Sequence, residues 1–236
     1  MFDGVRPFLE GTRSLQQLNS LSEERKVETE SGRPVRFVPP GTKHSAYEVK
    51  VFETGRVATR PDNLHDWFNA LAWLAFPRTK ARINAMHAAE IPREGGRRGR
   101  LRDLLTIFDE GGAIVHCDDA ALVALLGNFQ WKALFWDNRD RVRAAMRIVV
   151  FGHAVLEQAL EPWPGITCKA IFIPGGGDAD AHAASWLRAL PADATPRELA
   201  ALPIFGYPQW LPANEDAGFY DDERYFRPVP SYGKTG

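Results

Sequence analysis

Polar side chains interrupt two consecutive apolar segments between Asn63 and Glu90, and they are residue types that perform acid–base chemistry or bind polar ligands. A buried polar group costs free energy unless another group pairs with it, so the pattern indicates a site built inside a core. The residues concerned are His65, Asp66, Asn69, Asn84 and His87. The helical period of 3.6 residues places the first three in one quadrant of a helix. It places the last two, with Lys80 and Ile91, on one face of the next helix.

Four of these residues also have a purely structural explanation. Asp66 would cap its own helix, much as in a capping box that begins at Asn63. Asn69 would bond a loop, and the two histidines would be half-buried side chains with satisfied hydrogen bonds. The sequence leaves both interpretations open.

Two further places break the local pattern. Asp109 and Glu110 fall in the last turn of a predicted helix, where the helix dipole disfavours negative charge. His153 lies within an apolar stripe, and Glu157, one turn further on, is within reach of its imidazole. The structural alternatives are neutralisation of the two carboxylates by Arg102 or a basic loop, and a buried His–Glu pair that only fixes helix register.

These three places together predict one polar site with unassigned roles, formed by His65, Asp66, Asn69, Asn84, His87, Asp109, Glu110 and His153. Imidazoles and carboxylates suit a divalent metal such as zinc, and metal-assisted hydrolysis is the most natural chemistry for such a set. The candidate metal ligands are His65, His87, Asp109, Glu110 and His153. No HExxH or GxSxG motif occurs, and neither Cys117 nor Cys168 has an activating partner, so covalent catalysis has no support.

Charge and hydropathy restrict the other classes of partner. A formal net charge of -1 over 236 residues gives no overall field to attract nucleic acid or an anionic membrane. The longest apolar run, Trp67 to Phe76, is too short to span a bilayer, and the N-terminus lacks the pattern of a signal peptide. We therefore expect a cytoplasmic protein without membrane association.

Two alternatives to a small-molecule site stay open. One is a non-catalytic interaction or structural protein, whose internal polar groups only stabilise the fold and whose basic loop meets an acidic partner. The other is nucleic-acid binding through that loop, which spans 93–100 and contains Arg93, Arg97, Arg98 and Arg100. No aromatic residue is interleaved there for base stacking, which argues against nucleic acid.

The elements that must position these residues are mainly helical. Periodicity and capping signals predict helices over 14–25, 63–76, 77–91, 101–110, 119–126, 138–160, 180–190 and 196–202. Strands are predicted at 35–38, 113–117 and 166–173, and a hairpin from 47–52 and 57–59. Gly152, next to His153, suits the close approach of another backbone. The fold class is therefore α+β, mainly α, with a helical core, a few short strands and an aromatic, Pro-rich C-terminal arm.

The predicted domain organisation has one main part. A peripheral segment, 1–61, carries a short helix and the β-hairpin, and the main helical domain spans 62–228. A flexible tail follows at 229–236. The C-terminal arm is expected to pack over the domain through its aromatic residues, Trp210, Phe219, Tyr220, Tyr225 and Phe226.

Four sequence blocks also indicate a family. They are HDWFNALAWLAFPRTKARINAMHAAE, GRLRDLLTIFDEGGAIV, FGHAVLEQAL and PIFGYPQWLPANEDAGFYDDERYFRP. In content and order they resemble the proteobacterial proteins grouped as domain of unknown function 3025. The resemblance covers about Asn63 to Pro228, and it implies one domain over most of the chain and a bacterial source. It carries no catalytic residue over to this chain.

Overall fold

Two sheets of unequal size organise the computed structural model, which describes residues 1–10, 13–41, 47–95 and 97–229. The small sheet pairs β1 (Arg36–Val38) in parallel with β2 (Arg56–Ala58). The larger sheet has the order β4-β3-β5-β6, formed by Met146–Val150, Gly112–Cys117, Thr167–Ile173 and Ala200–Pro203. Within it β3 and β5 are parallel, whereas β4 and β6 pair antiparallel to their neighbours.

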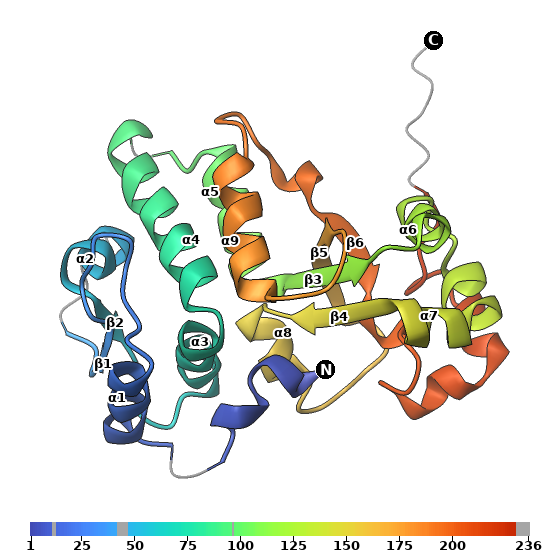
Figure 1. Ribbon diagram of the computed structural model, residues 1–236, viewed down its shortest axis with the longest axis horizontal. Coiled ribbons are helices and arrows are strands. Elements are labelled where there is room, and N and C mark those ends of the chain that lie inside the picture. Colours follow the sequence, from blue (N-terminus) through green and yellow to red (C-terminus); the bar gives the residue numbers. More distant parts are fainter. Residues whose placement is uncertain (11–12, 42–46, 96, 230–236) are drawn as a thin grey trace.

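Helices lie between the two sheets and on their outer sides. They are α1 (Leu15–Glu24), α2 (Tyr47–Thr54), α3 (Leu64–Ala75), α4 (Pro77–Glu90), α5 (Arg100–Gly111), α6 (Ala120–Gly127), α7 (Arg139–Ala145), α8 (His153–Gln158) and α9 (Ala179–Ala189). Figure 1 shows α3 and α4 between the small sheet and the larger one, with α5 and α9 beside α4. The α+β, mainly α class is therefore confirmed.

Short helical turns complete the chain. A π-helical turn covers Ala133–Asp137. The 3-10 turns are Phe2–Gly4, Arg6–Phe8, Ile91–Arg93, Pro196–Glu198, Ile204–Gly206, Pro212–Glu215 and Ala217–Asp221. Within the described ranges, no helix combines the length and the apolar character that crossing a bilayer requires.

The α3–α4 corner forms as the sequence predicts. Asn63 caps α3 by accepting a hydrogen bond from the Asp66 backbone nitrogen at 2.9 Å. Pro77 ends α3 and starts α4 at its first position, where a missing N–H is harmless. The side chain of Asp66 does not complete a capping box with Asn63. It accepts instead from the backbone nitrogen of Arg60, at 2.7 Å.

The predicted hairpin is wrong. Residues 47–54 form α2, and β2 pairs with β1 in parallel, a pairing that needs a crossover rather than a tight turn. The alternation in YEVKVF also fits a helix, because Tyr47 and Val51 lie one turn apart and Val51 is buried. Gly55 then ends the helix at a φ of +70, a conformation that favours glycine. Packing against α4 outweighs the strand propensity of the two valines.

The long helix predicted over 138–160 is also wrong. The chain forms α7, then β4, then α8, because the β-branched run from Ile148 to Val150 pairs antiparallel with β3. The predicted helix over 196–202 is likewise a 3-10 turn followed by β6, which pairs with β5. In both places strand pairing overrides a spacing that fits a helix equally well.

A cluster of phenylalanine rings fixes the start of α8 against the helices. Phe151 lies 5.4 Å from Phe76 at the α3–α4 corner and 5.1 Å from Phe108 in α5, measured between ring centroids. Gly152 follows, and a Cβ atom there would lie 2.5 Å from the backbone nitrogen of Gly112. The predicted close approach at Gly152 is therefore confirmed. It places the first residue of α8, His153, against the end of α5.

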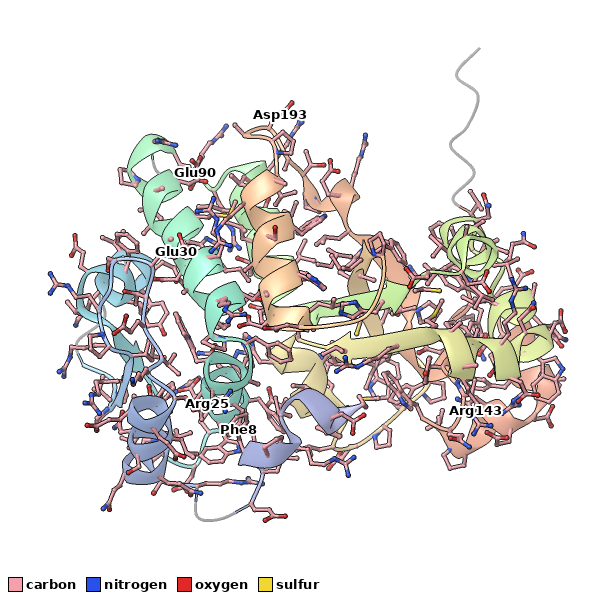
Figure 2. The ribbon with its side chains drawn as sticks, viewed as in Figure 1. Phe8, Arg25, Glu30, Glu90, Arg143 and Asp193 are labelled. Atoms are coloured by element: carbon pink, nitrogen blue, oxygen red, sulfur yellow. The ribbon has the colours of Figure 1, made fainter. Side chains whose placement is uncertain are left out.

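The N-terminal segment shares this core. The guanidinium of Arg25, the residue that follows α1, lies over the ring of Phe8 at 5.0 Å and donates to the backbone oxygen of Leu74 in α3 at 3.1 Å. Figure 2 labels Phe8 and Arg25 where the first turns of the chain meet α1 and α3. Val35, Phe37 and Val57 are buried here as well. The domain limits stay a prediction.

The C-terminal arm packs against the sheet. Tyr220, Tyr225 and Phe226 are buried, whereas Trp210 and Phe219 are partly buried. The hydroxyl of Tyr225 donates to the Ile166 carbonyl at 2.8 Å and accepts from the Phe205 backbone nitrogen at 2.9 Å. Apart from Val229, which is exposed, the predicted flexible tail lies outside the described residues.

Candidate functional site

A cavity of about 510 Å³ opens among α2, α3, α4, α5 and α8. Side chains from all three places singled out in the sequence line it. The eight predicted residues found there are His65, Asp66, Asn69, Asn84, His87, Asp109, Glu110 and His153. Of these, Asn84, His87 and His153 are buried, and Glu110 is exposed at the end of α5. The structure thus brings the whole predicted set to one cavity.

Lys80 joins three of the cavity helices. Its ammonium in α4 donates to the Asp109 carboxylate of α5 at 2.6 Å and to the Asn69 side-chain oxygen of α3 at 2.7 Å. Burial alone would raise the pKa of Asp109, but the charge and hydrogen bond of Lys80, together with His153 and His87, outweigh it and the pKa is lowered. Lys80, rather than Arg102 or the basic loop, therefore neutralises Asp109.

His87 and Arg102 form a second contact between α4 and α5. The Arg102 Nε–H donates to His87 Nδ1 at 3.2 Å, and the same guanidinium donates to Glu94 at 2.7 Å. Burial lowers the pKa of His87 to about 4, so the ring is neutral at pH 7. Because Nδ1 accepts a hydrogen bond, the single ring proton sits on Nε2. His87 is therefore a neutral N–H donor in the cavity wall.

His65 and His153 face one another across the inner end of the cavity. Their Nε2 atoms lie 3.1 Å apart and their ring centroids 4.6 Å apart. His153 Nδ1 lies 2.8 Å from the Asp109 carbonyl oxygen, and His65 Nδ1 lies 3.0 Å from the Glu157 carboxylate. A carbonyl oxygen can only accept, so the proton of neutral His153 is on Nδ1 and its Nε2 carries a lone pair.

The two contacts of His65 together require an additional proton. With Glu157 ionised and both rings neutral, His65 faces an acceptor at each ring nitrogen but carries a single N–H, so only one of the two contacts can be a hydrogen bond. Both contacts are hydrogen bonds only when Glu157, His65 and His153 hold one proton more than that. Burial lowers the pKa of His153 to about 4, so at pH 7 the additional proton is not on His153.

Glu157 has a different partner from the predicted one. The sequence placed it beside His153 on one continuous helix, but α8 begins at His153 and Glu157 bonds His65 instead. The predicted imidazole–carboxylate contact therefore exists, with the histidine of another helix.

Asp66 has a clear structural role. Its carboxylate accepts from the Arg60 backbone nitrogen and from two guanidinium nitrogens of Arg60, the latter both at 2.8 Å. These bonds tie the start of α3 to the segment after β2. Burial alone would raise the pKa of Asp66, and the bonds from Arg60 lower it overall. The Asp66 carboxylate therefore stays ionised, and both of its oxygens already accept hydrogen bonds from Arg60.

Asn84 joins α4 to α2. Its Nδ2 donates to the Glu48 backbone oxygen at 2.9 Å and to the Glu48 carboxylate at 2.6 Å. Burial raises the pKa of Glu48, which the Asn84 hydrogen bond only partly opposes. The side-chain oxygen of Asn84 is buried and has no partner among the described residues.

Five charged residues of this cavity lie outside the predicted set: Glu48, Arg60, Lys80, Arg98 and Arg102. Lys80 shares the face of Asn84 and His87 at spacings of four and three, a signal that was present in the sequence. Glu48 lies on the helix that was predicted as a strand, so no signal placed it here. Arg60 precedes α3 and enters only through Asp66.

The candidate metal ligands are not arranged as a metal site among the described residues. Across the described ranges, no three His, Cys, Asp or Glu side chains are arranged to hold a metal ion. The predicted ligands are instead committed to one another or to other partners: His65 and His153 to each other, Asp109 to Lys80, and His87 to Arg102. These residues do not fit a metal centre.

The basic loop is partly neutralised within the chain. Arg93 pairs with Glu90 at 2.8 Å and Arg98 pairs with Asp103 at 2.9 Å. Arg98 also donates to the Thr106 hydroxyl at the cavity wall. These pairings reduce the charge that the loop offers to nucleic acid.

Comparison with known proteins adds the family. No curated protein and no solved structure matches the chain. The family described as "Protein of unknown function (DUF3025)" matches residues 35–229, which include every helix that lines the cavity. The resemblance noted in four sequence blocks is confirmed over most of the chain. The chain therefore belongs to the DUF3025 family.

Proposed function

We propose that this protein is an enzyme that binds a small polar molecule in the cavity and transfers a proton to or from it. The proposal is carried by one observation, the 3.1 Å contact between the Nε2 atoms of His65 and His153. Both Nδ1 atoms are already directed at acceptors, so the contact holds a proton that the pair can give up.

His65 is suited to act as the general acid. Its side chain is 39% exposed, whereas that of His153 is 5% exposed, so a ligand in the cavity reaches His65 first. Loss of the shared proton leaves an ionised Glu157 and two neutral rings, and the return of a proton restores the pair. His153 is a positioning residue because it holds the ring of His65 in place and is itself held by the Asp109 carbonyl.

Two donors in the wall are suited to a developing negative charge. Lys80 uses two of its ammonium hydrogens on Asn69 and Asp109, which leaves one. The neutral His87 offers Nε2–H, much as a neutral imidazole polarises a carbonyl in other enzymes. Hydrolysis by a metal-bound water is not part of the proposal, because the ligand arrangement it needs is absent from the described residues.

The main alternative is a structural network without catalysis. The closed pairs Lys80–Asp109 and Arg60–Asp66 favour it, because they already satisfy each other. The oxygen of Asn84, which has no partner among the described residues, and the partly exposed ring of His65 argue for a ligand instead.

A screen of small polar metabolites tests the proposal. Binding is followed by NMR of ¹⁵N-labelled histidine side chains, and conversion is followed by product analysis. We expect a compound that shifts the His65 and His153 signals and is converted, with conversion lost in His153→Gln. The matched control is His182→Gln, a histidine of α9 that does not line the cavity. The proposal fails if no compound shifts these signals or if both variants behave alike.

A further inference from the structure

The facing sides of α4 and α5 carry polar side chains at three successive positions, called levels below. Lys80, Asn84 and His87 follow one another on α4, and Asp109, Thr106 and Arg102 follow in the opposite direction on α5. The first level is closed by the Lys80–Asp109 pair at 2.6 Å, and the last by the Arg102–His87 bond at 3.2 Å. The middle level, with Asn84, has no such bond across it.

The orientation of the Asn84 amide is determined by its neighbours. Its nitrogen faces the backbone oxygen of Glu48, which can only accept, so the nitrogen and oxygen positions cannot be exchanged. Its oxygen, on a residue that is 2% exposed, is then an acceptor without a partner in the described structure. A buried acceptor that stays unpaired is destabilising, so an N–H or O–H group of a ligand would satisfy it.

The next position on this face offers the complementary group. His87 lies three residues after Asn84, a spacing that puts two side chains about 5–6 Å apart on a helix. Because the His87 Nδ1 atom accepts from Arg102, the ring proton is on Nε2. This Nε2–H has no partner in the described structure and is therefore available as a donor. An acceptor and a donor side by side match the N–H and C=O of one planar amide group.

The charge of the cavity does not favour an ionic ligand. The side chains that line it include four cations, Arg60, Lys80, Arg98 and Arg102, and four carboxylates, Glu48, Asp66, Asp109 and Glu110. His65 Nδ1 faces the Glu157 carboxylate at 3.0 Å. An uncharged polar ligand is therefore not penalised by the local field.

We propose that the ligand carries an uncharged carboxamide or ureide group. Its N–H donates to the Asn84 side-chain oxygen, and its carbonyl oxygen accepts from His87 Nε2. This inference rests on the proposed function and names the ligand class of the same cavity. It also aligns the ligand carbonyl with the row of α4 donors that begins at Lys80.

Three probes of the same shape test the inference: propionamide, propionate and butanone. Propionamide has N–H donors beside its carbonyl, propionate has only acceptors and a charge, and butanone has only the carbonyl. Affinities are measured by NMR titration, which follows the Asn84 side-chain amide and the His87 ring. We expect propionamide to bind about tenfold more tightly than either other probe, the value of one hydrogen bond to a buried partner.

Variants locate the preference. In Asn84→Leu the three affinities should come within about threefold of one another, because the acceptor is gone. The matched control is Asn128→Leu, an exposed asparagine at the end of α6 that does not line the cavity; it should retain the preference for propionamide. The probe comparison in the unaltered protein stands even if a variant does not fold.

The outcomes separate this inference from the proposed function. Propionate or butanone binding as tightly as propionamide would overturn the inference and leave the cavity a small-molecule site. Absence of binding by all three probes, with a ligand found in the metabolite screen, also overturns the inference alone. Absence of any ligand in both experiments overturns the proposed function as well.

Discussion

Replacing Lys80 by methionine tests the electrostatics of the cavity most directly. The Lys80 side chain is 5% exposed and that of Asp109 is 20% exposed, so the substitution leaves a largely buried carboxylate without its partner. Removing one member of a buried ion pair costs about 3–5 kcal/mol. Water in the cavity reaches part of Asp109, so we expect the lower end, about 3 kcal/mol in the free energy of unfolding.

The cost should depend on pH. In the unaltered protein the pKa of Asp109 is lowered, so its stabilisation is present above the unfolded value of 3.8 and is lost as pH falls through the folded value. Without Lys80, burial is the largest remaining influence and raises the pKa of Asp109, while His153 and His87 oppose it. The variant then takes up a proton at higher pH than the unaltered protein does. The difference between the two proteins should therefore shrink as pH falls from about 7 to about 4.

Urea unfolding followed by circular dichroism at both pH values measures this effect. The matched control is Lys132→Met, because Lys132 pairs with Asp221 at 2.7 Å with side chains that are 42% and 62% exposed. It should cost at most about 1 kcal/mol. Adding Asp109→Leu to Lys80→Met should recover stability, since the unpaired charge is removed. The reasoning is refuted if Lys80→Met costs no more than Lys132→Met, or if its cost does not shrink at low pH.

Three further predictions concern the elements around the cavity. Gly152→Ala should cost about 1–3 kcal/mol in the free energy of unfolding and weaken the His65–His153 NMR signature, because its Cβ would lie 2.6 Å from the Glu110 carbonyl oxygen. The control is Gly111→Ala, whose Cβ would have no atom within 4 Å. Equal costs for the two variants would contradict the packing argument. His87 has a pKa lowered to about 4 by burial, so its stabilisation is present above pH 6.5 and is lost as pH falls to about 4. His87→Gln should flatten that decrease in urea unfolding, and an unchanged slope would count against a neutral His87. Tyr225→Phe should cost about 1–3 kcal/mol in thermal unfolding, because two buried backbone groups lose their partner; a neutral effect would show that water replaces the hydroxyl.

The residues that violate a local rule in the sequence are the ones that meet at the cavity. His65 and His87 stand out because polar groups on apolar faces are costly, and Asp109 because the helix dipole disfavours a carboxylate in the last turn; this reasoning needs no knowledge of the tertiary structure. His153 stood out for the same reason although its predicted helix was wrong. An apolar stripe with one imidazole is equally visible whether the chain before it is a helix or a strand.

The elements that depend on long-range pairing were not predictable from the sequence. The run from Met146 to Val150 fits a helical spacing, and only β3, far away in the chain, makes it a strand. The helix α2 depends on α4 in the same way, and with it the position of Glu48 was lost. The partners of the predicted site residues were therefore harder to predict than the residues themselves.

The place of His153 directly after β4 has a consequence for local unfolding. β4 lies at one edge of the larger sheet, where strands separate most readily from their neighbours. A ligand that holds His65 also holds His153, and through Phe151 it restrains the end of β4. Ligand binding should therefore slow amide hydrogen exchange in Ile148 and Val150, although neither residue lines the cavity. Amide exchange at this edge of the sheet would then measure ligand binding in a cavity that no strand of the larger sheet lines.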